Sequence, residues 1–337
     1  MFDEPTNFLF FLPPILFVVI FIVVIVSIIK SSKKAKESYE RRVNKIQMTQ
    51  GANIEKYYQM LTTDPELVKR RKQSIHNGKI IGIGLLLLFA SFFTGLFFIG
   101  IPIFIICIVY TAKHGNAYSS YYKQHIIGAA LKDYDDNLSY FPTEGISSQE
   151  YNYAHFESYD RYHSEDLIKG DLDGLPFVIS DVHTEDRRED SDGDTYYVTL
   201  FHGPVAILTL EKPTNIQVSI IDNTIHLGTG DTYLEIDNPE FEEHYDVYTD
   251  DKVKAMRFLT PSVTNKILDL RKSYDLHFEI KLLDQLVYFR FEIGELFVPN
   301  ASDTRKEAMD IALYFEILNG IKDVMKEINN SIEFLKK

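Results

Sequence analysis

The chain has no tryptophan and only one cysteine, Cys107, among its 337 residues. A single cysteine cannot form an intramolecular disulfide, so cysteine usage says nothing about the redox compartment. Cys107 also lies inside a long apolar run, where the reactive thiolate form of cysteine is disfavoured. These absences exclude a disulfide-stabilised scaffold, and we expect Cys107 to be chemically inert.

The sequence also lacks the short patterns that mark common catalytic and nucleotide-binding sites. It contains no GxSxG elbow, no HExxH pair, no P-loop and no GxGxxG pattern. We therefore predict no bound cofactor, and an enzyme is the less favoured class of protein. A Ser-His-Asp triad is not excluded by this search, because such groups converge only in space.

Acidic residues at alternate positions resemble a calcium-binding loop at one place, Asp190, Asp192 and Asp194. An EF-hand loop that starts at Asp190 requires glycine at its sixth position and glutamate at its twelfth. Those positions are Thr195 and Phe201, so the pattern fails. We expect an acidic hairpin tip between two strands, and a weak divalent-ion site is the alternative.

Long apolar runs occur only in the first third of the chain. Phe8–Ile29 contains 22 residues without a charge, which is enough to cross the hydrocarbon core of a membrane. Its acidic start is unlike a cleaved signal peptide, so we predict an uncleaved anchor. Ile80–Thr111 contains 32 residues, with break points at Gly95, Gly100 and Pro102. We expect a hairpin of two short transmembrane helices there, and a single kinked span is the alternative.

Charge is distributed unevenly about residue 114. Residues 1–114 carry 14 Lys and Arg against 7 Asp and Glu, whereas residues 115–337 carry 21 against 42. The acidic part repels polyanions, so we expect no nucleic-acid partner. Residues 30–79 carry 13 Lys and Arg against 5 Asp and Glu, and basic residues beside membrane spans stay in the cytoplasm. The N-terminus is then outside, and a hairpin returns the acidic domain to the cytoplasm.

These patterns divide the chain into four parts. A transmembrane anchor over residues 1–29 precedes a basic helical cytoplasmic loop over 30–79, a transmembrane hairpin over 80–112 and an acidic soluble domain over 113–337. The helical loop is expected to break at Thr63–Glu66, where a capping residue precedes a proline.

The soluble domain combines helical and strand-like patterns. The predicted helices are Gly115–Tyr140, Thr260–Tyr274 and Ser302–Phe334. The predicted strands are Leu167–Leu172, Pro176–His183, Tyr196–Leu210, Ile216–Ile221, Thr232–Ile236, His277–Leu283 and Leu286–Ile293. The predicted fold class is α+β, in which N-terminal transmembrane helices are followed by a mostly antiparallel sheet with covering helices.

Apolar residues recur every three or four positions along the last predicted helix. They are Ile311, Phe315, Leu318, Ile321, Met325, Ile328, Ile332 and Leu335. A stripe of this length is sufficient for a coiled-coil or oligomer contact. The interpretation we favour is that it covers the domain's own sheet.

One polar cluster combines aromatic residues with an arginine just before the first predicted strand. An ion pair of Arg161 with Asp160 or Asp166 would brace the entrance to the sheet. Arginine and aromatic residues are also enriched at protein contacts. The candidate partner surface therefore consists of Tyr159, Asp160, Arg161, Tyr162 and Asp166.

The ten histidines are scattered along the sequence. His183 and His202 fall on neighbouring predicted strands and can approach each other. With Glu185 or Asp186 they would supply ligands for a metal ion. No metal-binding spacing supports this arrangement, so we predict no metal site.

Several segments of the chain, taken in order, resemble the pattern of a known protein family. Residues 159–170 read YDRYHSEDLIKG, and the other segments are Phe177–His183, Leu200–Gly203, Asp237–Glu242, Val247–Asp251 and Phe258–Pro261. In this order they resemble a bacterial membrane-protein family catalogued as domain of unknown function 3137, over residues 40–335. The resemblance implies a basic helical lead-in, a membrane hairpin and a C-terminal soluble domain, and it implies no activity. The first apolar run looks like an addition to the family pattern.

The sequence as a whole predicts a multi-pass protein of the cell membrane without enzymatic activity. We expect a scaffold or adaptor that contacts the lipid bilayer and whose acidic cytoplasmic domain binds a protein partner or a second copy. One alternative is a membrane-tethered hydrolase or metal-dependent enzyme that uses His, Asp or Glu from the strands. Another is a sensor or transporter accessory subunit. An independent transporter is disfavoured, because three short spans without internal charge offer little for a transport pathway.

Overall fold

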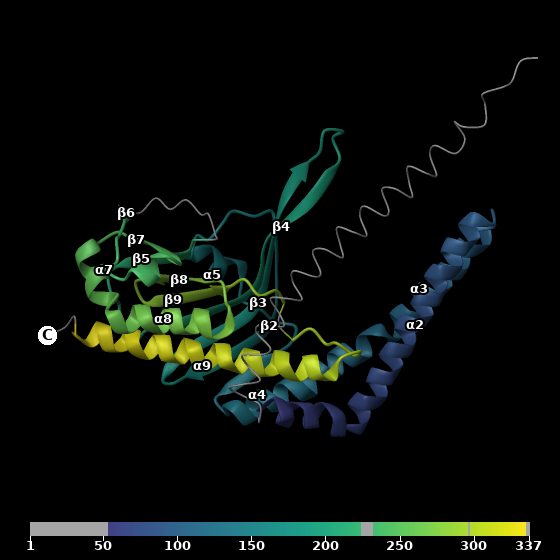
Figure 1. Ribbon diagram of the computed structural model, residues 1–337, viewed down its shortest axis with the longest axis horizontal. Coiled ribbons are helices and arrows are strands. Elements are labelled where there is room, and N and C mark those ends of the chain that lie inside the picture. Colours follow the sequence, from purple (N-terminus) through teal and green to yellow (C-terminus); the bar gives the residue numbers. More distant parts are fainter. Residues whose placement is uncertain (1–52, 224–231, 296, 335–337) are drawn as a thin grey trace, which may run out of the picture. The chain divides into compact units, whose positions relative to one another are not determined.

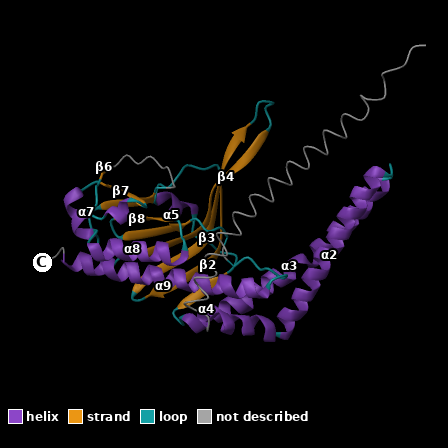
Figure 2. Ribbon diagram, viewed as in Figure 1, coloured by secondary structure: helices purple, strands orange, loops and turns teal. Residues whose placement is uncertain are grey.

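A computed structural model describes residues 53–337, except for 224–231, 296 and 335–337. The predicted anchor Phe8–Ile29 lies outside these residues. Two long apolar helices are followed by a nine-stranded antiparallel sheet and its helices (Figure 2). The predicted α+β fold class is thereby confirmed.

The expected break in the helical lead-in is present. Residues 53–63 are helical, and α2 (Pro65–Phe93) begins after Asp64. The Asp64 carboxylate accepts a hydrogen bond from the backbone N–H of Leu67 at 2.7 Å, which satisfies a donor that the first turn leaves unpaired. Helix α2 then continues through residues 79 and 80, so the basic segment and the start of the apolar run form one helix.

Helices α2 and α3 (Phe97–Tyr121) pack as an antiparallel hairpin, and both are long and apolar enough to cross a membrane. The turn between them contains Gly95 at φ +72°, a left-handed conformation that suits glycine. Gly100 and Pro102 lie inside α3, so only one of the three predicted break points ends a helix. A side-chain atom built on Gly84 would lie 3.0 Å from Cys107 Sγ, which shows how closely the helices approach.

The helical path continues beyond α3 but ends earlier than predicted. A π-helix, η1 (Tyr122–Ile127), and α4 (Gly128–Tyr134) complete it. The predicted helix to Tyr140 is wrong in its last residues, because strand β1 (Leu138–Phe141) begins there and pairs with β2. Such a short edge strand depends on its partner strand more than on its own sequence pattern.

The strands form a single sheet in the order β1-β2-β3-β4-β9-β8-β5-β7-β6. The remaining strands are β2 (Arg161–Leu172), β3 (Leu175–Glu189), β4 (Thr195–Thr209), β5 (Gln217–Asp222), β6 (Thr232–Tyr233), β7 (Tyr245–Thr249), β8 (Phe278–Leu283) and β9 (Leu286–Phe291). All seven predicted strands are present. Strand β2 starts six residues before its predicted start, because a β-bulge between Glu165 and Ile168 interrupts the alternation of its first half.

The outer halves of β3 and β4 extend beyond the rest of the sheet (Figure 1). Pairing with β2 ends at Glu185 and pairing with β9 begins at Val205, so residues 186–198 pair mainly within their own hairpin. At its tip, Asp190 accepts hydrogen bonds from the backbone N–H groups of Asp192 and Asp194 at 3.0 and 2.9 Å. The predicted acidic hairpin tip is confirmed.

Helices α8 (Pro261–Tyr274) and α9 (Thr304–Phe334) lie side by side along the sheet (Figure 1). The described members of the α9 stripe are all buried, and they are Ile311, Phe315, Leu318, Ile321, Met325, Ile328 and Ile332. The stripe therefore belongs to the domain's own core, and it does not supply a free coiled-coil face. Short helices complete the domain: α5 (Ser148–Tyr153), α6 (Pro239–Glu242) and α7 (Lys252–Phe258).

Candidate functional site

A small cavity lies on strands β2, β3 and β4, beside the segment that follows β9. We call it the histidine pocket, and it is lined by His163, Glu165, Asp181, Val182, His183, His202 and Glu295. Its volume is about 140 Å³. Small-molecule sites usually have roughly 300–1,000 Å³, so this pocket fits an ion or a few waters better than an organic substrate.

The register of the sheet explains why the histidines meet. His163 pairs with His183 across β2 and β3, and His183 pairs with His202 across β3 and β4. Directly paired residues lie on the same face of a sheet, so the three imidazoles form a row across three strands. Glu165 and Asp181 are each two residues from a histidine of this row, which places them on the same face.

Two of the imidazoles, those of His183 and His202, contact each other, and that of His183 also contacts a neighbouring hydroxyl. The rings of His183 and His202 stack with centroids 4.5 Å apart, and His183 Nε2 lies 3.0 Å from Thr199 Oγ1. His163 lies at the rim, where its side chain is 72% exposed. Burial, together with the nearby His183, lowers the pKa of His202. The neutral imidazole that this favours is the form that binds metal ions.

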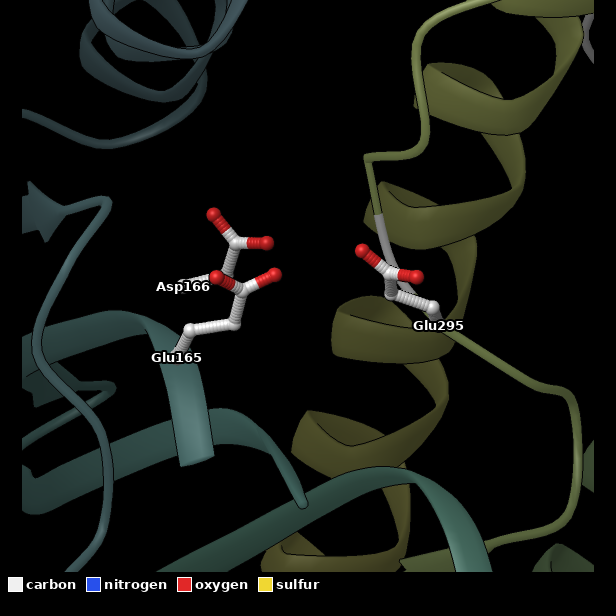
Figure 3. Close-up of side chains that lie close together, drawn as sticks. All are labelled: Glu165, Asp166 and Glu295. Carbon is white, nitrogen blue, oxygen red and sulfur yellow. The ribbon is translucent and has the colours of Figure 1, made fainter. Parts of the chain in front are cut away.

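Three carboxylates face one another at one side of the pocket (Figure 3). Glu165 and Asp166 come from β2, and Glu295 comes from the segment after β9; one oxygen of each lies within 4.8 Å of the others. Burial is the main cause that raises the pKa of Asp166 and of Glu295, and the charge of Glu165 acts in the same direction on both. Negative charge at this density calls for a proton or a cation.

Lys123 supplies one positive charge to this cluster. Its Nζ lies 2.6 Å from Asp166 Oδ2 and 3.1 Å from Glu165 Oε1, and the hydroxyl of Tyr140 also donates to Asp166. Consecutive side chains in a regular strand point to opposite faces, so a single lysine does not normally reach both. The bulge in β2 and the left-handed φ of +59° at Asp166 make this contact feasible.

Lys123 belongs to the π-helix η1, so two irregular pieces of backbone meet in one ion pair. Both π-helical segments and left-handed non-glycine residues cost free energy and are enriched at functional sites. The pair also joins the helical path that follows α3 to the first long strand of the sheet.

A second buried carboxylate joins the helical hairpin to the domain. Glu307 in α9 is fully buried and lies 3.0 Å from the guanidinium of Arg71 in α2. It accepts hydrogen bonds from the hydroxyl of Tyr118 in α3 at 2.6 Å and from the backbone N–H of Asn300 at 2.7 Å. Glu307 thus binds three separate segments of the chain.

The predicted partner surface divides in the structure. The rings of Tyr159 and Tyr162 pack against the buried Tyr151, and the hydroxyl of Tyr162 donates to the carbonyl of Ile146 at 2.7 Å. Asp166 is fully buried, 43 residues after its partner Lys123. Asp166 is thus removed from the surface, Tyr159 and Tyr162 are partly buried, and Asp160 and Arg161 are exposed.

Those two members, Asp160 and Arg161, brace the base of the projecting hairpin. Arg161 covers the ring of Tyr197 at 3.2 Å from its centroid and pairs with Glu185 at 3.8 Å. The partners predicted for Arg161 are engaged elsewhere, because Asp160 accepts the backbone N–H of Arg187 at 2.7 Å and Asp166 binds Lys123.

The predicted approach of His183 and His202 is confirmed. The prediction that Glu185 or Asp186 lies beside them is wrong. Glu185 pairs with Arg161, and Asp186 pairs with Arg188. The carboxylates of the pocket come from Glu165 and Glu295 instead. The sequence contains a signal for Glu165, because His163 and Glu165 are two residues apart on a strand and therefore lie on the same face. It contains no local signal for Glu295.

Comparison with known proteins gives a limited set of likenesses. A search of curated proteins finds no match. Among solved structures, the crystal structure of the mycobacterial trehalose monomycolate transport factor A, TtfA, is similar with a TM-score of 0.34 and 10% sequence identity. That likeness covers 60% of this chain and 97% of the other.

A protein-family model matches residues 199–330, which run from β4 into α9, and its description is "Protein of unknown function (DUF3137)". The match covers a shorter range than the predicted 40–335, and the segment Tyr159–Gly170 lies before it. The predicted resemblance is nevertheless confirmed: over residues 199–330 this chain is similar to the DUF3137 family.

Proposed function

We propose that the chain is a multi-pass membrane adaptor without enzymatic activity. In this proposal α2 and α3 form a transmembrane hairpin, and the acidic α+β domain lies at the cytoplasmic face and binds a protein partner. The observation that carries the proposal is the buried contact of Glu307 with Arg71 and Tyr118.

That contact favours a domain held firmly on its membrane helices rather than one on a flexible tether. Separating α9 from α2 and α3 would take the Glu307 carboxylate away from both the Arg71 guanidinium and the Tyr118 hydroxyl. The Lys123–Asp166 pair opposes the same separation at a second point. A domain fixed in this way presents a constant surface to a partner beside the membrane.

The projecting β3–β4 hairpin supports a partner-binding role. A two-stranded ribbon is marginal alone in water, and here Arg161 and Asp160 hold its base. Its tip carries the acidic residues Glu189 and Asp192, and Tyr196 nearby is 48% exposed. Exposed tyrosine within an acidic surface fits a protein partner with a basic contact face.

The size of the histidine pocket argues against an organic substrate at that one place, although hollows of about 420 and 530 Å³ lie elsewhere on the domain. At about 140 Å³ it is smaller than an ordinary substrate site of roughly 300 Å³ or more. An adaptor requires no such site.

Site-specific photocrosslinking in living cells tests the proposed partner. A photoreactive amino acid at Tyr196 should give a discrete adduct, and the same group at Asp269, whose side chain is 68% exposed on α8, should not. The adduct should weaken when Glu189→Gln and Asp192→Asn remove two acidic charges from the tip. Equal adducts at both positions, or none at Tyr196, would reject this partner surface.

A further inference from the structure

The basic residues of α2 divide between two faces of the helix. Arg71 is buried against Glu307, and Arg70 donates to Glu66 at 2.8 Å and to the backbone carbonyl of Ala117 at 3.2 Å. Both arginines are therefore engaged by the protein itself. The other basic side chains of α2 are exposed, and they are Lys69, Lys72, His76 and Lys79.

These four exposed residues share one side of α2, which we call the basic face. Their spacing of three, four and three positions keeps side chains on one side of a helix with 3.6 residues per turn. The same side continues into the apolar part of α2 with Ile83 and Leu87, which are 58% and 49% exposed. One surface thus changes from basic to apolar along the helix, as it does where a helix passes from lipid headgroups into hydrocarbon.

The change from basic to apolar coincides with an exposed tyrosine on the neighbouring helix. Gly84 of α2 lies against Cys107 of α3. Because the two helices are antiparallel, Ile81 is then level with Tyr110, which is 50% exposed. Tyrosine is enriched at the membrane–water interface, so the boundary of the hydrocarbon in the proposed hairpin falls just beyond Lys79.

Distances along the helix bring the basic face within reach of headgroups. At about 1.5 Å per residue, Lys72 lies roughly 10 Å and Lys69 roughly 15 Å from Lys79. The headgroup layer is about 5–8 Å deep on each side of the hydrocarbon. Lys79 and His76 therefore meet headgroups directly, and Lys72 and Lys69 lie within about two Debye lengths of roughly 8 Å each.

The hairpin itself offers little to neutralise the basic face. Leu67–Lys132 contains no Asp or Glu, although the chain has 49 of them. The single acid of α2, Glu66, lies 3.7 Å from Lys69 but also holds Arg70 at 2.8 Å. The domain has the opposite character, since residues 115–337 carry 42 Asp and Glu against 21 Lys and Arg. Such a domain is repelled by an anionic surface, and a basic face where α2 enters the bilayer offsets that repulsion.

We propose that the basic face of α2 binds the phosphate headgroups of anionic phospholipids in the leaflet beside the domain. The inference rests on the proposed function, because it requires α2 and α3 to span the bilayer. It adds a lipid preference that the adaptor role does not require.

Electron paramagnetic resonance of the full-length protein in phosphatidylcholine vesicles tests the preference. Spin-labelled phosphatidylglycerol and spin-labelled phosphatidylcholine are the two probes, and the spectra separate lipid held at the protein surface from bulk lipid. Phosphatidylglycerol should associate at least about twofold more strongly than phosphatidylcholine, and 0.5 M salt should reduce this ratio.

Two triple variants with the same change in charge are compared. Lys69→Gln/Lys72→Gln/Lys79→Gln should bring the ratio close to one. The matched control Lys212→Gln/Lys252→Gln/Lys326→Gln removes three exposed lysines of the domain and should keep the wild-type ratio. Exposed substitutions of this kind change stability little, so both variants should fold.

The outcomes separate this inference from the proposed function. Surface-held lipid without a preference for phosphatidylglycerol, or a preference that the α2 variant keeps, would overturn the inference and leave the transmembrane hairpin standing. Absence of surface-held lipid with either probe would reject the hairpin and the inference together.

Discussion

The guanidinium of Arg71 lies 3.0 Å from the carboxylate of Glu307, although the two residues are 236 positions apart in the sequence. Arg71 belongs to α2 and Glu307 to the first turns of α9, the last helix of the domain. Both side chains are buried. The pair therefore links the position of the domain on its helices to the stability of the fold.

Removal of one member of this pair should be strongly destabilising. Arg71→Met leaves Glu307 as an uncompensated buried charge, so we expect a loss of about 3–5 kcal/mol. Arg71→Met/Glu307→Leu removes both charges and should recover a large part of that loss. The matched control Lys69→Met changes a side chain that is 75% exposed and should have little effect. Thermal unfolding in detergent measures each variant; a single and a double variant of equal stability would contradict the prediction.

Asp166 allows the cost of backbone strain to be separated from the loss of its charge. The residue has a φ of +59°, which asparagine tolerates better than alanine does. Both Asp166→Asn and Asp166→Ala remove the charge facing Lys123. We expect the alanine variant to be less stable than the asparagine variant by about 1 kcal/mol or more, from strain and from the lost acceptor for Tyr140. Equal melting temperatures of the two variants would show that neither contribution matters.

Two glycines of α2 make a matched test of the helical hairpin. Gly84 is buried against Cys107, whereas a side chain at Gly82 would meet nothing within 4 Å. Gly84→Ile should therefore force the helices apart and lower the melting temperature, and Gly82→Ile should not. Cys107→Ala should partly relieve the Gly84→Ile defect by opening space at the contact. Equal melting temperatures of the two isoleucine variants would contradict the close packing of α2 and α3 at Gly84.

The sequence predicts best those features that depend on a few neighbouring residues. Thr260 and Pro261 define the start of α8, and Asp64 and Pro65 define the start of α2, because capping is a local hydrogen-bonding problem. Strand β7 was missed, although its residues alternate in burial, because its place between β5 and β6 depends on pairing over long distances.

The site shows the same division. The approach of His183 and His202 follows from alternation along two neighbouring strands, which the sequence reveals. The contribution of Glu295 depends on the path after β9, and that of Lys123 depends on a π-helix. Neither has a local pattern. The bulge in β2 directs Asp166 towards Lys123. The same bulge interrupts the alternation of apolar and polar residues from which the strand would be predicted.

The buried Glu279 predicts a definite dependence of stability on pH. It pairs with Arg290, yet burial raises the pKa of Glu279 above its ordinary value of 4.5. The folded protein then holds this proton more tightly than the unfolded chain does. Ionisation therefore removes stability as the pH rises from 4.5 through the folded pKa. Glu279→Gln lacks this titration, so the melting temperature of the wild type minus that of the variant should fall with rising pH. A difference that grows over this range would contradict the sign.

Sidedness of the acidic domain is the measurement that tests the proposed adaptor most directly. Cys107→Ala removes the only native thiol, and Asp192→Cys then places a single thiol at the exposed tip of the β3–β4 hairpin. Intact cells are treated with a membrane-impermeant maleimide and compared with lysed cells. We predict that the thiol is protected until the cells are lysed, as a transmembrane hairpin and a cytoplasmic domain require. Labelling of intact cells would contradict it, since the domain would then lie outside the membrane.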